Sequence, residues 1–313
     1  MRPTVIRAPF VLLAILVAAA GCAGKKAVAP KPVPRLLASR IALTVARGGN
    51  PGIELLDPAG GGFTRISPAS AIDGEPAISP DGMRIAFITT AVNGQRLMTM
   101  AVDGTDRRPC GSDPTLDASG PHWSPDSRHL VFTGTTGAGR NVYTILASGD
   151  SLHPVTDDGQ STALGWSPDG ARVLFLLQET VNDSTRDYLR DAEVGMGTMR
   201  TLLGPVLHTI IGADYAPDGA HITFCYEGAD IGFKVEVCNA DGSGRATVAD
   251  ANPPIEGLSA PTWSPDGSWI VFSAHITTGQ DDLYSATPSG NGDAALFLDP
   301  SVSVRQPSWG PKP

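Results

Sequence analysis

The sequence predicts an all-β fold, a six-bladed β-propeller of four-stranded blades. Three observations predict it: a repeated turn motif, an apolar strand after each copy, and one orphan copy at the end of the chain. The prolines of the motif stand at 80, 125, 168, 217, 265 and 311, so the copies are 43 to 49 residues apart. A period in the forties is typical of propellers, in which one repeat forms one sheet.

The motif itself has the chemistry of a tight turn. Its clearest copies are Trp123-Ser-Pro-Asp-Ser127, Trp166-Ser-Pro-Asp-Gly170 and Trp263-Ser-Pro-Asp-Gly267. Serine can bond its own backbone, proline fixes φ near −65°, aspartate tolerates the third position and glycine closes a type I turn. The following runs, such as Arg84-Ile-Ala-Phe-Ile88, are continuously apolar, which indicates strands buried on both faces. A third strand, a polar turn such as Asp103-Gly104 and an outer fourth strand complete each predicted blade.

The count of strands predicts how the ring closes. Arg40-Ile-Ala-Leu-Thr44 is a sixth apolar second strand with no turn motif before it. Gln306-Pro-Ser-Trp-Gly310 is a motif copy with no strand after it. We therefore expect the last strand to complete blade one, which removes the open sheet edges that invite aggregation.

This pattern resembles the repeat of the TolB-type propeller family over residues 40 to 313. The resemblance implies a domain used for protein contacts. The chain also departs from TolB itself. In TolB an α/β domain precedes the propeller and mediates partner contacts, whereas here only a short tether is expected before blade one. Membership of a Tol–Pal-like assembly is therefore not expected. In prolyl-oligopeptidase-like enzymes a catalytic domain follows the same propeller. Because the sequence ends at Pro313, such a domain is not expected here.

Residues 1–21 predict a lipoprotein signal peptide. Arg2 and Arg7 precede an apolar run, Phe10 to Ala20, whose 11 residues are too few to span a bilayer. Ala19-Ala20-Gly21-Cys22 resembles the bacterial lipobox, in which the cysteine is lipidated, although leucine is usual at the place of Ala19. The alternative is an ordinary secretory signal with an incidental cysteine. Because Ala23 rather than aspartate follows Cys22, the resemblance favours a periplasm-facing lipoprotein of the outer membrane.

Residues 22–35 are predicted to form the lipidated cysteine and a Pro/Lys tether. Residues 36–313 are predicted to form the propeller. Loss of the signal peptide removes two arginines and no acid, so the net charge changes from −9 to −11. An acidic protein is repelled by phosphate backbones and anionic headgroups. The predicted partners therefore exclude nucleic acid, and contact with the membrane is expected only through the lipid.

Cys225 and Cys238 flank one predicted hairpin. They could form a cross-strand disulfide in an oxidising compartment, or stand as two buried thiols facing opposite ways, because a shift of one residue reverses a side chain. Cys110 would remain unpaired in the first case.

The predicted strand directions divide the connections between two faces. The Ser-Pro-Asp-Gly and Asp-Gly turns share one face, the turn face. The connections from second to third strands and from each outer strand to the next blade share the other, the loop face. We expect longer, less repetitive segments there, including an insertion over residues 179–190 on blade four, and rigid scaffolds carry recognition on such segments.

Eight ionisable residues are predicted to surround the channel mouth on the loop face: Asp73, Glu75, Asp117, Asp157, Asp158, Glu256, His208 and Arg305. Their carboxylates could hold a cation such as Ca²⁺ or a basic segment of a partner. The alternative is that they are solvated loop acids. No other cofactor is expected.

Catalysis has little support in the sequence. The six histidines lack metal-motif spacing, and Gly165-Trp-Ser-Pro-Asp opens a repeated turn rather than a strand-to-helix elbow. The motif tryptophans are expected in the inter-blade core. The sequence thus predicts a monomeric, non-enzymatic propeller that binds an envelope protein or peptide. The alternative is a metal-assisted hydrolase or lyase of a polysaccharide or lactone, with its site at the channel mouth.

Overall fold

The architecture comes from a computed structural model of the chain. It describes residues 39–311 apart from 48–49, 59–61, 112, 114, 183, 207, 229–231, 252–254, 278, 291–293 and 298–302. The predicted signal peptide and tether lie outside the described residues. Within these limits all regular elements are β-strands, and there is no helix with the length and apolarity needed to cross a bilayer.

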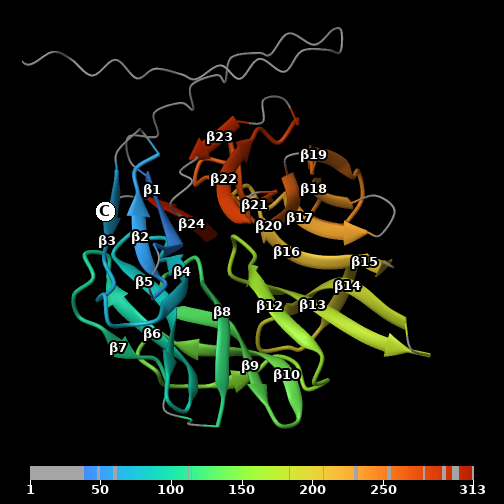
Figure 1. Ribbon diagram of the computed structural model, residues 1–313. Helices are drawn as coiled ribbons and strands as arrows, with labels where there is room; N and C mark the ends of the chain where they lie inside the picture. Colours follow the sequence, from blue (N-terminus) through green and yellow to red (C-terminus); the bar gives the residue numbers. More distant parts are fainter. Residues whose placement is uncertain are drawn as a thin grey trace, which may run out of the picture.

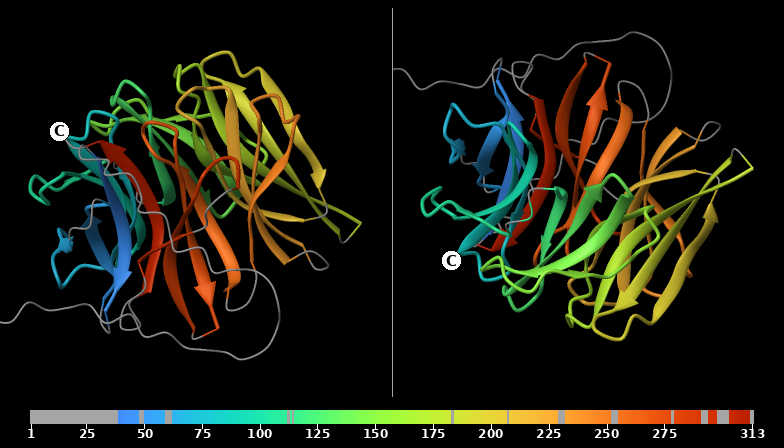
Figure 2. Two further views of the ribbon diagram at one scale, coloured as in Figure 1. Left: turned by 90° about the horizontal axis from the view of Figure 1, so that it is seen from above. Right: turned by 90° about the horizontal axis from the view of Figure 1, so that it is seen from below.

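Six four-stranded antiparallel sheets stand as blades around a central axis (Figure 1), and Figure 2 shows the same ring edge-on. The innermost strands are β24 (Ser303–Pro311), β4 (Asp73–Ile78), β8 (Asp117–Trp123), β12 (Ser161–Trp166), β16 (Thr209–Tyr215) and β20 (Ile255–Trp263). The second strands are β1 (Ser39–Ala46), β5 (Arg84–Ala91), β9 (His129–Thr136), β13 (Arg172–Val181), β17 (His221–Gly228) and β21 (Ile270–Ile276).

The outer half of each blade is more variable in length. The third strands are β2 (Gly52–Leu56), β6 (Gly94–Ala101), β10 (Gly139–Leu146), β14 (Ser184–Glu193), β18 (Gly232–Asn239) and β22 (Gln280–Ala286). The outermost strands are β3 (Phe63–Arg65), β7 (Arg108–Pro109), β11 (His153–Pro154), β15 (Met199–Val206), β19 (Ala246–Asp250) and β23 (Ala294–Phe297). The all-β six-bladed propeller predicted from the repeat is thereby confirmed.

The apolar core lies between blades. Six clusters of buried side chains occur in the described part of the chain, and each joins two neighbouring blades. Phe87, Phe175, Phe224 and Phe272, all on second strands, are fully buried. Strands with an apolar neighbour on both faces need apolar residues at every position, which explains the continuous runs in the sequence.

The ring closes as the sequence predicts. β24 pairs antiparallel with β1, with Ser39 opposite Pro311 and Val45 opposite Val304. Trp309 and Val304 pack with Ile41 and Val271, so the seam buries apolar surface from blades one and six. The two ends of the propeller thus form one blade.

The repeated turns also have the predicted chemistry. In blade two Gly82 N–H donates to Ser79 O at 2.8 Å, and the Ser79 hydroxyl donates to the Asp81 carboxylate at 2.6 Å. Blades three, four and six repeat this arrangement around Ser124, Ser167 and Ser264.

Two expectations about the connections are wrong. β5–β6 and β9–β10 are tight hairpins of two residues, not long loops. Apart from residues 182–183, the predicted insertion at 179–190 belongs to β13 and β14, which pair up to Val181 opposite Ser184. The density of charge in this segment suggests a loop, but alternate residues of β14 are buried, including Asp187 and Leu189. This long hairpin projects beyond its neighbours in Figure 2.

The disulfide hypothesis is also wrong. Cys225 lies opposite Val235, and Cys238 lies opposite Ile222, so an odd offset separates the two thiols and they face opposite ways. Cys225 packs in the core between blades five and six, and Cys238 in that between blades four and five. Burial raises the pKa of both thiols, to about 12 for Cys225 and about 11 for Cys238.

Removing residues 303–313 should abolish the closed ring. Ile41, Leu43 and Val45, which have no exposed surface, would then lie on a free strand edge. We expect oligomers in light scattering after size exclusion and a lower, less cooperative thermal transition by circular dichroism. Val92→Ser, at a fully exposed hairpin position, is the control that should change neither. A truncated protein that stays monomeric with the full-length melting temperature would disprove this closure.

Candidate functional site

A cavity of about 540 Å³ lies on the propeller axis and is lined by all six innermost strands. Each of these strands pairs on one side only, with the second strand of its blade. Its other backbone edge therefore faces the axis, and several N–H and C=O groups of this edge bond side chains of neighbouring blades. Ala77 O accepts the Trp123 Nε1–H at 2.9 Å, and Ile78 N–H donates to the Ser308 hydroxyl at 3.0 Å. The channel is thus lined by polar backbone as well as by side chains.

Every innermost strand is irregular where it lines the channel, because its register against the second strand shifts there. Glu75, Ala260 and Gln306 take positive φ values of 50° to 54° at this point, and a proline follows each of them. Such a conformation is costly for residues other than glycine and persists only where neighbouring contacts hold it.

Glu75 has contacts that hold it in this way. Its N–H lies 3.0 Å from the Thr44 hydroxyl and 3.3 Å from Gln306 Oε1, both in blade one. Its carboxylate accepts the Gly120 N–H of blade three at 2.5 Å. One residue of β4 therefore links three consecutive blades across the seam. Burial raises the pKa of this carboxyl, and the bond from Gly120 opposes the rise.

Two further ionisable groups line the channel. Asp214 Oδ2 accepts the Thr262 hydroxyl and the Trp263 N–H, both at 3.1 Å, and burial raises its pKa to about 6. Burial lowers the pKa of His122 to about 4. The Thr162 hydroxyl, also in the lining, has no hydrogen-bond partner among the described residues. The channel wall thus holds polar groups that are poorly solvated.

Asp214, His122 and Thr162 were not predicted as site residues from the sequence. Asp214 and His122 stand three residues before the motif proline, directly before Tyr215 and Trp123, the first residues of their motif copies. That position is Ala77 in blade two and Gly165 in blade four, so no recurring residue type marks it. The signal that could have found them is that, when the repeats are aligned, this position is ionisable only in His122 and Asp214.

The eight predicted mouth residues do not come together. Among these described positions only Glu75 lines the channel. Asp73 is buried and bonds Arg107 through both oxygens, at 2.9 and 3.1 Å, between blades one and two. Asp117 pairs with Arg96 at 3.4 Å on the rim of blades two and three.

The remaining five have local partners or solvent. Asp158 accepts the Ser161 hydroxyl at 2.7 Å, and Arg305 pairs with Asp281 of β22. The His208 ring stacks on that of Tyr226, with centroids 5.6 Å apart. Asp157 and Glu256 are exposed. In the described part of the chain no three histidine, cysteine, aspartate or glutamate residues are placed to hold a metal ion.

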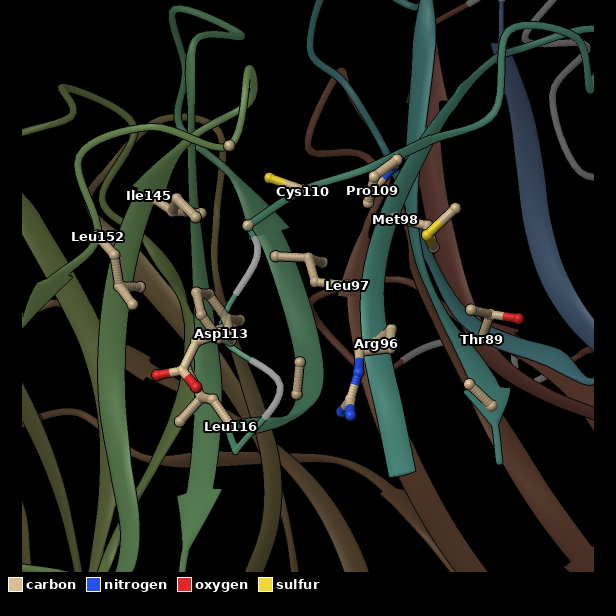
Figure 3. Close-up of a pocket in the computed structure, with 15 residues that line it drawn as sticks. Thr89, Arg96, Leu97, Met98, Pro109, Cys110, Asp113, Leu116, Ile145 and Leu152 are labelled. Atoms are coloured by element: carbon tan, nitrogen blue, oxygen red, sulfur yellow. The ribbon is translucent and has the colours of Figure 1, made fainter. Parts of the chain in front are cut away.

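A second hollow, of about 360 Å³, lies between blades two and three (Figure 3). Leu97 of β6 and Ile145 of β10 face it from opposite sides, with Cys110 and Leu116 between them. Arg96 and Asp113 supply its charged groups. Apolar walls with few polar groups are typical of sites for small apolar groups.

Comparisons with known proteins bear on this geometry. The family model described as the TolB beta propeller domain matches residues 108–313. This chain belongs to that family. It is 23% identical over 238 residues to the Tol-Pal system protein TolB of Francisella tularensis subsp. mediasiatica, which covers 61% of this chain and 54% of that protein.

Other similar proteins carry different names. The uncharacterized peptidase YuxL of Bacillus subtilis is 30% identical over 215 residues, 66% of this chain and 30% of that protein. The TolB-like chain therefore spans about a third to a half of the length of these relatives. Among solved structures, TolB from Acinetobacter baumannii has a TM-score of 0.71 at 18% identity, covering 87% of this chain and 66% of that one. An oligogalacturonate lyase in complex with manganese has a TM-score of 0.55 at 15% identity, covering 83% and 74%.

The pKa shifts of Asp214 and His122 have opposite signs, so the two residues should affect the pH dependence of stability in opposite ways. The pKa of Asp214 is higher in the folded than in the unfolded protein, so its contribution to stability is lost as the pH rises from about 4 to about 6. In Asp214→Asn this loss is absent. We expect the free energy of unfolding of the variant, relative to wild type, to increase by about 2–3 kcal/mol between pH 4 and pH 7 in urea titrations.

His122→Asn is the matched comparison. The pKa of His122 is lower in the folded protein, so its contribution is present above pH 6.5 and lost as the pH falls toward 4. Relative to wild type, this variant should lose stability as the pH rises over the same range. Parallel pH profiles for wild type and both variants would show that neither group is buried in the channel.

Proposed function

We propose that this TolB-like propeller is a non-enzymatic binding module of the cell envelope, which docks a protein or peptide at the loop-face end of its channel. The observation that carries the proposal is the channel wall, in which the six innermost strands surround the polar side chains of Glu75, Asp214, His122 and Thr162. Such a wall offers hydrogen bonds to an extended chain segment. Relatives named as Tol-Pal system proteins support a partner in the envelope.

The alternative is a metal-assisted hydrolase or lyase. The peptidase name of YuxL and the lyase structure support it. Metal-assisted chemistry requires converging ligands and an open coordination position. The described residues supply no such group, and the two channel carboxyls, Glu75 and Asp214, both have direct bonds to neighbouring blades. The binding role is therefore the stronger candidate.

We also propose that the chain is anchored as a lipoprotein of the outer membrane facing the periplasm, with residues 1–21 as signal peptide, 22–35 as lipidated cysteine and tether, and 36–313 as the propeller. The support is the order of charge, apolar run, small residues and Cys22 in the sequence.

Binding is tested at Ile211, an exposed residue of β16 that lines the channel. A tagged form of residues 23–313 should recover a saturable partner from crosslinked envelopes. Ile211→Ser should weaken that binding roughly tenfold, the loss of one apolar contact in a docking site. Met83→Ser is the control, because Met83 is exposed on the turn face of blade two and should not matter. Equal loss in both variants, or no saturable partner, would refute docking at the channel.

Anchoring is tested at Cys22. In cells fed an alkyne fatty acid, the wild-type chain should be labelled and should fractionate with membranes. Cys22→Ser should be unlabelled, while Ala23→Ser should behave as wild type because it keeps the thiol. Label that persists in Cys22→Ser, or wild-type protein without label, would show that the cysteine is incidental.

A further inference from the structure

The turns between third and fourth strands follow a common rule in four blades. In blades two, three, five and six a glycine with φ of 72° to 96° occupies the turn, at positions 104, 149, 242 and 290. Each glycine touches the outer part of the preceding blade. A Cβ on Gly149 would lie 2.8 Å from Gly111 N, and one on Gly290 would lie 3.0 Å from Thr247 O. Glycine is needed there because the neighbouring backbone leaves no room for a side chain.

Blade four departs from this rule. Its turn reads Val194-Gly-Met-Gly-Thr-Met199, and Met196 N–H approaches Glu193 O at 3.4 Å, as the glycine N–H does in the other blades. The two flanking glycines take the positive φ values, and a Cβ on either would meet nothing within 4 Å. The turn therefore stands clear of blade three. Met196 is 76% exposed, and Val194 and Met199 are 40% and 42% exposed.

A hollow of about 560 Å³ lies beside this turn, between blades three and four on the turn face. Val194, Trp166 and Leu146 form its apolar wall, and His129 and His153 also line it. Trp166 is only partly buried, whereas the other motif tryptophans, Trp123, Trp263 and Trp309, are 6–7% exposed. The surface that glycine seals elsewhere is open here.

The charge at the rim is acidic. Asp126 and Asp169 line the hollow, and the hydroxyls of Ser124 and Ser167 hold the pKa of these carboxyls below the usual range. Asp126 accepts hydrogen bonds from the Ser124 hydroxyl and the Arg128 N–H through Oδ1, and Asp169 accepts from the Ser167 hydroxyl and the Ala171 N–H through Oδ1. The Oδ2 of each carboxylate can therefore take another donor. Arg128, on the same turn as Asp126, and Arg172, which helps to lower the pKa of Asp169, are bases near the rim, and His129 Nδ1 lies 3.9 Å from Asp126 Oδ1. An indole beside carboxylates favours a cation, and a methionine adapts to an apolar side chain.

We propose that this hollow is a second docking site, for an extended segment of a partner protein in which a lysine or arginine adjoins an apolar residue. The apolar residue packs on Met196 and Val194, and the cation lies over Trp166 between Asp126 and Asp169. The site lies on the face opposite the channel mouth and goes beyond the function proposed above.

The probe is a fluorescein-labelled peptide of four Lys-Leu repeats, with four Glu-Leu repeats as its charge-reversed counterpart. In anisotropy titrations the full chain should bind the Lys-Leu peptide at least tenfold more tightly than the Glu-Leu peptide. Val194→Ser/Met196→Ser should weaken that binding roughly tenfold. Both changes are at exposed positions, and circular dichroism should show an unchanged fold.

The controls separate this site from general acidity and from the channel. Met83→Ser removes an exposed methionine of the same face in blade two, and Ile211→Ser alters the channel; both should bind the Lys-Leu peptide as wild type does. Weakening by either control to the same degree as by the double variant would overturn the proposal. So would equal binding of the two peptides, or no binding of the Lys-Leu peptide. If Ile211→Ser loses the envelope partner but still binds the Lys-Leu peptide as wild type does, the peptide binds outside the channel, as proposed.

Discussion

The antiparallel pairing of β24 with β1 is the contact on which the rest of the structure depends. Every other blade is made from consecutive residues and can form its own sheet, whereas blade one needs strands from both ends of the chain. Because the apolar clusters lie between blades, each sheet is stable only when it has a neighbour on both sides. The pairing that completes blade one therefore determines whether all six blades are covered on both faces or two apolar faces remain exposed.

Most of this architecture could be predicted because the repeat is a local signal. The Ser-Pro-Asp-Gly turn specifies its own geometry within five residues, and the run after it shows by its continuous apolarity that the strand is covered twice. The errors arose where side-chain chemistry depends on distant neighbours. The β13–β14 hairpin carries charges that suggest solvent, yet Asp191 is buried, where it bonds Arg172, Arg200 and the Tyr215 hydroxyl. The local sequence around Asp191 cannot indicate these partners, because they lie on three different strands.

The candidate site was less predictable for the same reason. The loop acids are conspicuous in the sequence, but inward curvature brings strand residues, not loop residues, to the axis. Glu75 was predicted as a loop acid, and it lines the channel because it belongs to the innermost strand β4. Asp214 and His122 were missed because their importance comes from burial around the axis, a property of the closed ring. The disulfide hypothesis failed on a register difference of a single residue, which sequence alone does not fix.

The place where the chain enters the propeller has a geometric consequence for a molecule held by lipid. Ser39 pairs with Pro311 at the end of β24 that leads toward the turn face, so the leader meets the ring on that side. A stretch of 16 residues between Cys22 and Ser39 reaches about 50 Å when extended. In a molecule anchored as proposed above, the lipid would therefore be attached on the Ser-Pro-Asp-Gly side, and the channel mouth would lie on the side opposite the attachment.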